Sequence, residues 1–169
     1  MRFKCNQCND YHDANDLSYG GDAPIQWSII SEGDRIKSLI GNDQCEILVN
    51  NEYSYYIRAC LEIPIINTPK VFTWGVWCSL SEKSYAEVLG NWENPNREKI
   101  GPHFGWLCSK LPDYPDTVYM KTMVHQRGLG LRPLVILEPS EHPLSVHQYS
   151  GIDTKDLINR ISNYLHSSS

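Results

Sequence analysis

The sequence predicts an α+β fold in which a mainly antiparallel sheet is flanked by helices. Two periodicities predict it. Residues 45–49, 53–63 and 71–80 alternate apolar and polar side chains with a period of two, which is typical of strands with one buried face. The first two segments are separated only by the polar turn at residues 50–52, so they are expected to form a hairpin with the third strand beside it.

Helical periodicity appears in two other segments. Residues 81–92 carry one apolar stripe, formed by Tyr85, Val88, Leu89 and Trp92. Asp153 or Thr154 can cap a last helix whose apolar side chains return every three or four positions and should pack on the sheet. A short helix is expected after Asp22 and Pro24, and two more strands are expected at residues 118–124 and 131–137.

Length and composition predict one domain spanning residues 1–169. The chain has 169 residues, 41% of them hydrophobic, which is enough to bury a sizeable core, and it contains no internal repeat or long linker. Residues 1–20 are expected to form a zinc-knuckle segment packed on the sheet.

The opening of the chain carries its most specific motif, Cys5-x-x-Cys8-x-x-x-His12. Two cysteines at this spacing can bind one tetrahedral metal ion, and a following histidine can supply a third ligand. A closed shell of Cys and His ligands is typical of structural zinc, whereas catalytic zinc keeps one position open for water. The alternative is that these are unpaired thiols, or a disulfide, beside a solvated histidine.

The fourth ligand must come from elsewhere in the chain. We favour Cys45, because it follows a turn-like segment and stands at the entrance of a predicted strand. Cys60 is the rival, since it shares the polar face of its strand with Arg58 and Glu62. Cys78 and Cys108 belong to apolar surroundings and are expected to be core residues.

The charge balance excludes some partners. The net charge is −5 and no cluster of Lys or Arg occurs, so nucleic acid is not expected as a partner. No apolar run reaches membrane-spanning length, and the N-terminus lacks a secretory signal, so a cytoplasmic protein with reduced cysteines is expected. An acidic surface suits a basic protein partner.

Aromatic side chains gather in a segment, residues 94–115, that is rich in Pro and Gly and is expected to be irregular. Its rings, among them Phe104, Trp106 and Tyr114, either plug the open end of the sheet or form a binding surface. Alternation also places Trp74 in the core and Trp77 on the opposite face, where small neighbours should leave the Trp77 ring accessible.

Catalytic motifs are scarce. No phosphate-binding loop, nucleophile elbow or zinc-protease helix occurs. The nearest constellation is Glu138 with His142, because a carboxylate can fix the tautomer of a nearby histidine. The plainer interpretation is a capped turn in which His142, held extended before a proline, bonds the adjacent backbone.

Several motifs in fixed order resemble a bacterial family of small uncharacterised proteins, domain-of-unknown-function family 2199. They are Cys5-x-x-Cys8-x-x-x-His12, Asp43-Gln-Cys45, Arg58 with Leu61-Glu-Ile-Pro64, Phe72-x-Trp74-Gly-Val-Trp77, Phe104-Gly-Trp106-Leu107, Leu111-Pro-x-Tyr114-Pro, Arg132-Pro133 and Glu138-Pro-x-x-His142-Pro-Leu144. The resemblance implies a shared fold and supports Cys45 over Cys60 as the fourth ligand. It implies no activity.

Two functions follow as expectations. The first is a non-enzymatic protein-binding domain stabilised by structural zinc, such as an immunity protein that neutralises a bacterial toxin, with binding residues Arg58, Trp77, Phe104, Trp106, Tyr114, Glu138 and His142. The second is a metal-dependent or histidine-based hydrolase that uses the Glu138 and His142 region, with Arg58, Glu62 and His125 in a pocket walled by tryptophans.

Overall fold

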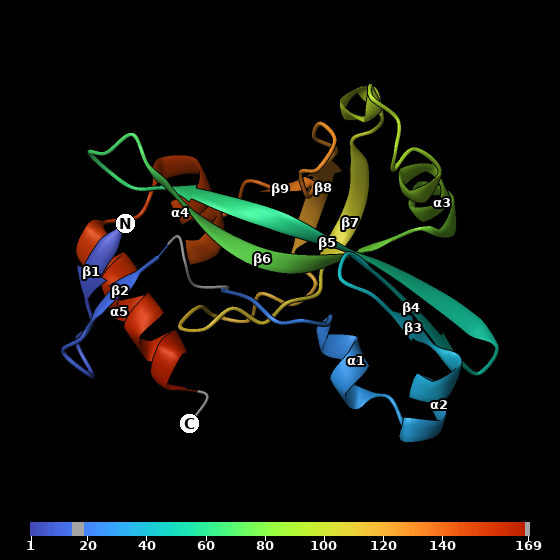
Figure 1. The fold of residues 1–169 in the computed structure, drawn as a ribbon, viewed down its shortest axis with the longest axis horizontal. Helices are drawn as coiled ribbons and strands as arrows, with labels where there is room; N and C mark the ends of the chain where they lie inside the picture. The colour runs from blue at the N-terminus through green and yellow to red at the C-terminus, as the bar shows by residue number, and fades with distance from the viewer. Residues whose placement is uncertain (15–18, 168–169) are drawn as a thin grey trace.

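The computed structural model describes residues 1–14 and 19–167 (Figure 1), so residues 15–18 of the expected knuckle segment lie outside the described residues. The strands are β1 (Arg2–Lys4), β2 (Tyr11–Asp13), β3 (Leu39–Ile40), β4 (Gln44–Val49), β5 (Glu52–Pro64), β6 (Val71–Leu80), β7 (His103–Leu107), β8 (Lys121–His125) and β9 (Leu134–Leu137). The helices are α1 (Ile25–Ile29), α2 (Glu32–Lys37), α3 (Glu82–Gly90), the 3₁₀ turn η1 (Arg97–Lys99), α4 (Pro143–Ser150) and α5 (Thr154–His166).

The larger sheet has the order β3-β4-β5-β6-β7-β8-β9, and an additional β5–β9 pairing closes its last five strands into a mixed barrel. The neighbours in the sheet are antiparallel, as predicted, but the closing pair is parallel. Cys60 stands opposite Leu134 there, and the Cys60 N–H donates to the Pro133 carbonyl over 2.8 Å. The predicted α+β fold is thus confirmed, with a barrel in place of an open antiparallel sheet.

The predicted hairpin of β4 and β5 is also confirmed. Its tight turn contains Asn50 and Asn51, whose φ angles are 52° and 63°. A two-residue turn with positive φ at both positions matches the right-handed twist of the flanking strands, and asparagine tolerates that backbone better than most residues.

A main core fills the barrel and extends beneath α4 and α5. Leu61 and Trp74 from the long β5–β6 hairpin are buried in it, together with Leu144 of α4 and both Leu157 and Ile161 of α5. The apolar stripe predicted for the last helix therefore packs as expected.

Trp77 is 0% exposed, so the prediction of an accessible ring is wrong, although it does lie on the face opposite Trp74. It belongs to a second core cluster with Cys45, Ile47, Tyr56 and Cys108. Trp27 and Ile30, from the α1 segment, pack against this cluster, and the Trp77 indole N–H donates to the Gly21 carbonyl over 3.1 Å. The α1 segment thus buries the sheet face that alternation predicted to be accessible to solvent.

The segment expected to be irregular contains β7. Its side chains alternate between buried and exposed, with Phe104 and Trp106 pointing outward. A Cβ at Gly105 would lie 2.4 Å from the Ser79 carbonyl oxygen, so glycine permits the close strand approach. Among the described residues, no helix is long and apolar enough to cross a membrane.

Candidate metal centre

The N-terminal hairpin of β1 and β2 presents the first three predicted ligands. Its turn is closed by hydrogen bonds from the Cys5 N–H to the Asp10 carbonyl (2.9 Å) and from the Asn9 N–H to the Cys5 carbonyl (3.1 Å). Asn9 has a φ of 62°, which reverses the chain just after Cys8. The Gln7 N–H points at the Cys5 sulfur over 3.4 Å, as expected where a backbone amide stabilises a thiolate ligand.

Helix α5 adds a fourth group, His166. The ligand atoms of Cys5, Cys8, His12 and His166 all lie within 4.8 Å of one another, so this cluster could hold a metal ion. The His12 Nε2 is 3.2 Å from the Cys8 Sγ, and the His166 Nε2 is 3.3 Å from the Cys5 Sγ. Zn–S bonds of about 2.3 Å and Zn–N bonds of about 2.0 Å place neighbouring tetrahedral ligands roughly 3.3 to 3.8 Å apart, which is close to the spacing found.

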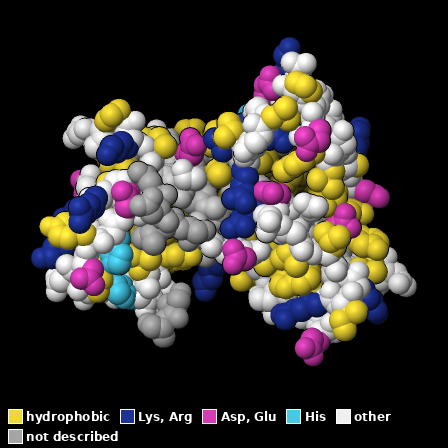
Figure 2. Space-filling model, in the orientation of Figure 1, with side chains coloured by type: hydrophobic (Ala, Val, Ile, Leu, Met, Phe, Trp, Pro, Cys, Tyr) yellow, Lys and Arg dark blue, Asp and Glu magenta, His cyan; other side chains and the backbone are white. Residues whose placement is uncertain are grey.

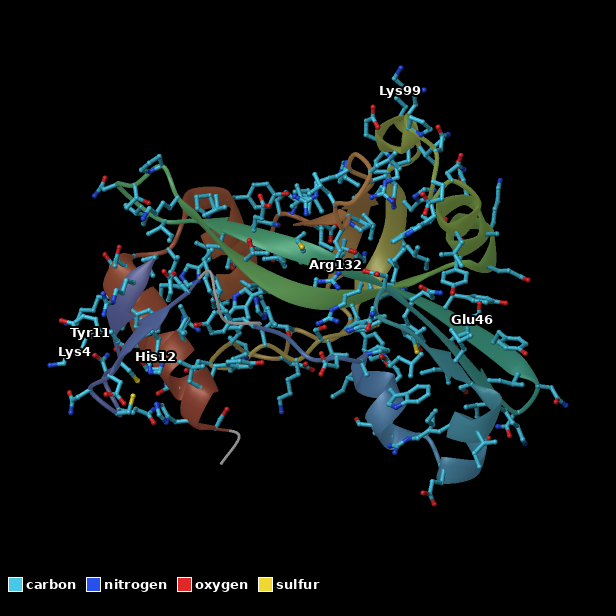
Figure 3. All side chains as sticks on the ribbon, in the orientation of Figure 1. Lys4, Tyr11, His12, Glu46, Lys99 and Arg132 are labelled. Atoms are coloured by element: carbon cyan, nitrogen blue, oxygen red, sulfur yellow. The ribbon has the colours of Figure 1, made fainter. Side chains whose placement is uncertain are left out.

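Polar contacts hold the hairpin turn against α5. The Asn6 backbone N–H donates to the Ser162 hydroxyl over 3.4 Å, and its side-chain amide donates to Asn159. The Gln7 side chain reaches Asn163 over 2.8 Å. Figure 2 shows histidine side chains at the end of the molecule where Figure 1 places β1, β2 and α5, and Figure 3 labels His12 there.

Electrostatics at the cluster favour one thiolate. Burial acts to raise the pKa of Cys5, but the backbone N–H groups of Cys8 and Gln7, the Ser162 hydroxyl and His166 lower it to about 6. The pKa of Cys8 is raised: the Asp10 backbone acts to lower it, and burial together with the neighbouring Cys5 sulfur outweighs that effect. A divalent cation between the two sulfurs would remove their mutual repulsion.

The structure does not bring Cys45 or Cys60 to this cluster. Cys45 is 0% exposed in the second core, where burial first and the nearby Glu46 second raise the pKa of its thiol to about 12. A buried neutral thiol there acts as a small apolar side chain. Cys60 is half-buried on β5, in a cavity with several arginines.

His166 was missed because no local pattern links it to the cysteines, which precede it by more than 150 positions. No sequence signal marks His166; it reaches the cluster because it lies one helical turn after Ser162, which contacts the knuckle turn in the structure.

Three of the predicted binding residues are on the surface, namely Phe104, Trp106 and Glu138. Phe104 is 46% exposed and Trp106 is 39% exposed, and their rings make an edge-to-face pair with centroids 5.2 Å apart. Across the sheet, Phe104 stands opposite Met123, which stands opposite Ile136, so an apolar row crosses the outer face of the barrel. We call this area, with Phe104, Trp106, Met123, Ile136 and Tyr149, the β7–β9 face; a hollow of about 270 Å³ lies within it.

Two further predicted binding residues, Arg58 and Tyr114, lie outside the β7–β9 face. Arg58 lies opposite Trp77 in the β5–β6 pair, with its guanidinium 5.9 Å from that indole and 3.4 Å from the Asp22 carboxylate. Tyr114 is largely buried, and its hydroxyl lies 2.7 Å from His147 Nδ1 beneath the Arg160 guanidinium.

Glu138 and His142 do not form a common site in the structure. Glu138 is exposed at the rim of the β7–β9 face, in the hollow that His125 also lines. His142 is the N-cap of α4: its Nδ1 accepts from the Leu144 N–H, and its Nε2 lies 3.1 Å from the Asp116 carbonyl oxygen. Both ring nitrogens are therefore engaged in fixing the backbone, which agrees with the capped-turn interpretation.

Comparison with known proteins places this barrel with its Cys/His cluster in one family. The chain belongs to the family described as "Uncharacterized protein conserved in bacteria (DUF2199)", whose model matches residues 4–152. The matched range includes Cys5, Cys8 and His12, whereas His166 lies beyond it. Neither a curated protein nor a solved structure matched the chain.

Proposed function

We propose that Cys5, Cys8, His12 and His166 bind one structural zinc ion that fastens α5 to the N-terminal hairpin. The observation that carries this proposal is the approach of two sulfur and two imidazole nitrogen atoms to within 4.8 Å of one another. Two thiolates with two imidazoles form a donor set that suits zinc. Four protein ligands fill the tetrahedron, so no position is left for a substrate or a catalytic water.

The test is metal analysis of protein purified without chelator. About one zinc per chain is expected, and Cys8→Ser or His166→Ala should reduce it strongly. Cys45→Ala is the matched control, because it also removes a thiol and should retain the metal. Loss of zinc from the Cys45 variant together with its retention in the His166 variant would contradict the proposal.

We further propose that this zinc-stabilised fold is a non-enzymatic domain that binds a protein through the β7–β9 face. The exposed Phe104 and Trp106 rings supply the kind of aromatic anchors that dominate protein interfaces. Lys121 and Glu138 stand at its rim, where polar side chains surround an apolar centre. The net charge of −5 favours a basic partner, as expected of an immunity protein that neutralises a toxin.

Capture from cells that express the protein natively tests this second proposal. Phe104→Ala and Trp106→Ala should weaken capture of a specific partner by speeding its dissociation. Tyr53→Ala is the matched control, since that ring is 52% exposed but lies outside the β7–β9 face. Association should slow as salt rises, because charge steers the encounter. Equal capture by all three variants would contradict the assignment of this face.

A further inference from the structure

A cavity of about 460 Å³ lies where the barrel closes between β5 and β9. Cys60 of β5 lines it together with Trp92, Arg97, Arg127 and Arg132. This volume falls within the range of about 300 to 1,000 Å³ that is common for small-molecule sites. The cavity is separate from the metal cluster, since Figure 3 labels Arg132 near the middle of the molecule and His12 at one end.

Arg97 places a buried positive charge in the cavity wall. Its side chain is 4% exposed and donates to the carbonyl oxygens of Trp92, Arg127, Gly128 and Leu131 over 2.6 to 2.9 Å. Within the described part of the chain no carboxylate forms an ion pair with it. Carbonyl dipoles therefore solvate this charge without neutralising it, which favours an anion nearby.

The guanidinium groups of Arg127 and Arg132 make only some of the hydrogen bonds that they can donate. Arg127 pairs with Glu62 over 3.2 Å, and Arg132 pairs with Asp43 over 2.8 Å through its Nε. Three guanidinium groups thus face two carboxylates. The Arg132 side chain is 42% exposed, and none of the hydrogen bonds found among the described residues uses its two Nη groups, so both can donate to a ligand.

The positive charge is a local property, because the whole chain carries −5. Figure 2 shows a band of Lys and Arg side chains near the middle of the visible face, in the region where Figure 3 labels Arg132. The cavity is lined by three arginines and one carboxylate, that of Asp43, and such an excess of positive charge concentrates anions.

We propose that this cavity binds a small organic anion through a carboxylate or phosphate group. The two Nη groups of Arg132 match such an oxyanion, and Arg127 can add its Nη2, because its Nε donates to the Arg132 carbonyl and its Nη1 to Glu62. The Arg97 charge strengthens the attraction. The body of the ligand lies over the Cys60 thiol and against Trp92. This site is independent of the zinc and of the β7–β9 face.

The half-buried Cys60 thiol provides a reporter inside the cavity. Its thiolate attacks an added aromatic disulfide, a mixed disulfide forms, and an aromatic thiolate leaves. The zinc-loaded protein is treated in parallel with dianionic dithiobis-nitrobenzoate and with uncharged dithiodipyridine. Peptide mass mapping assigns the modification to Cys60, and the quantity compared is the ratio of the two labelling rates at that residue.

Arg132→Gln should lower the ratio of anionic to neutral labelling roughly five-fold, because one positive charge near the thiol is lost. Lys83→Gln, which removes the same charge from an exposed position outside the cavity, should leave the ratio unchanged. Arg132→Lys keeps the charge and should retain most of the ratio.

Inorganic phosphate and malonate then distinguish the two oxyanion types. At least one of them should protect Cys60 from the neutral reagent with saturation, and Arg132→Gln should abolish the protection. Protection by phosphate alone assigns a phosphate-bearing ligand, and protection by malonate alone assigns a carboxylate. An unchanged rate ratio in Arg132→Gln, or no protection by either anion, would overturn the proposal.

Discussion

His166 Nε2 lies 3.3 Å from Cys5 Sγ, although 161 positions separate the two residues. The first strands and the last helix of the chain therefore meet at one cluster, which Figure 1 shows as α5 beside β1 and β2. A metal ion at this point would join the two ends of the chain, and such a cross-link stabilises a fold because the binding energy becomes folding energy.

His166→Ala should loosen both ends of the chain while leaving the barrel intact. Hydrogen exchange measured by mass spectrometry should speed up in α5 and in the β1–β2 hairpin, but not in β5 and β6. His125→Ala is the control, since it removes another half-buried imidazole that is not part of the cluster. Equal exchange of α5 in the two variants would argue that His166 carries no metal.

The metal-free protein should become more stable between pH 6 and pH 9. The folded protein holds the pKa of Cys5 at about 6, below the ordinary value of 9.0, so within this window the unfolded chain binds more protons. The stabilisation is complete above pH 9 and is lost as pH falls through about 6. Denaturant unfolding of chelator-treated protein measures it, and Cys5→Ser should flatten the slope. If the free energy of unfolding of Cys5→Ser still rises with pH to the same extent, another group is responsible for the pH dependence.

Trp77→Ala should destabilise the protein as strongly as Trp74→Ala, by about 3 to 5 kcal/mol, because both rings are fully buried. Trp106→Ala provides the comparison, since that ring is 39% exposed and should cost much less. Urea unfolding of the three variants measures the differences. A loss of under 1 kcal/mol in Trp77→Ala would mean that the α1 segment does not cover this face in solution.

Tyr114→Phe should cost about 1 kcal/mol of stability without weakening partner capture. Burial first, and Arg160 second, lower the pKa of His147, so its neutral ring can accept a hydrogen bond from the Tyr114 hydroxyl at pH 7. Urea unfolding and the capture assay give the two readouts. Weaker capture with unchanged stability would contradict this prediction and indicate that Tyr114 contacts the partner.

Local patterns predicted several of the regular elements, although not α2 or α4. The β4–β5 hairpin follows from strict alternation around Asn50 and Asn51, and α5 follows from its apolar stripe. Strand β7 was missed because glycines such as Gly105 are typical of loops. In the structure Gly105 instead permits the close approach of the Ser79 backbone. Barrel closure was missed because it rests on a single parallel pair, Cys60 with Leu134, which does not change the sequence pattern of either strand.

The site was predictable only where its residues are neighbours in sequence. Cys5, Cys8 and His12 form a local motif and do meet. The fourth ligand, His166, could be predicted only by knowing which distant element packs on the knuckle. Periodicity can be read from one segment, but packing between two distant segments cannot. Cys45 fitted the strand pattern, yet the α1 segment buries its face of the sheet.

X-ray absorption at the zinc edge of the purified protein tests the central claim most directly. Sulfur and nitrogen ligands differ in bond length, about 2.3 Å against about 2.0 Å, so their numbers can be counted. Ligation by Cys5, Cys8, His12 and His166 predicts two sulfur and two nitrogen atoms. Three sulfur atoms with one nitrogen, the set that Cys45 or Cys60 would complete, would contradict the account.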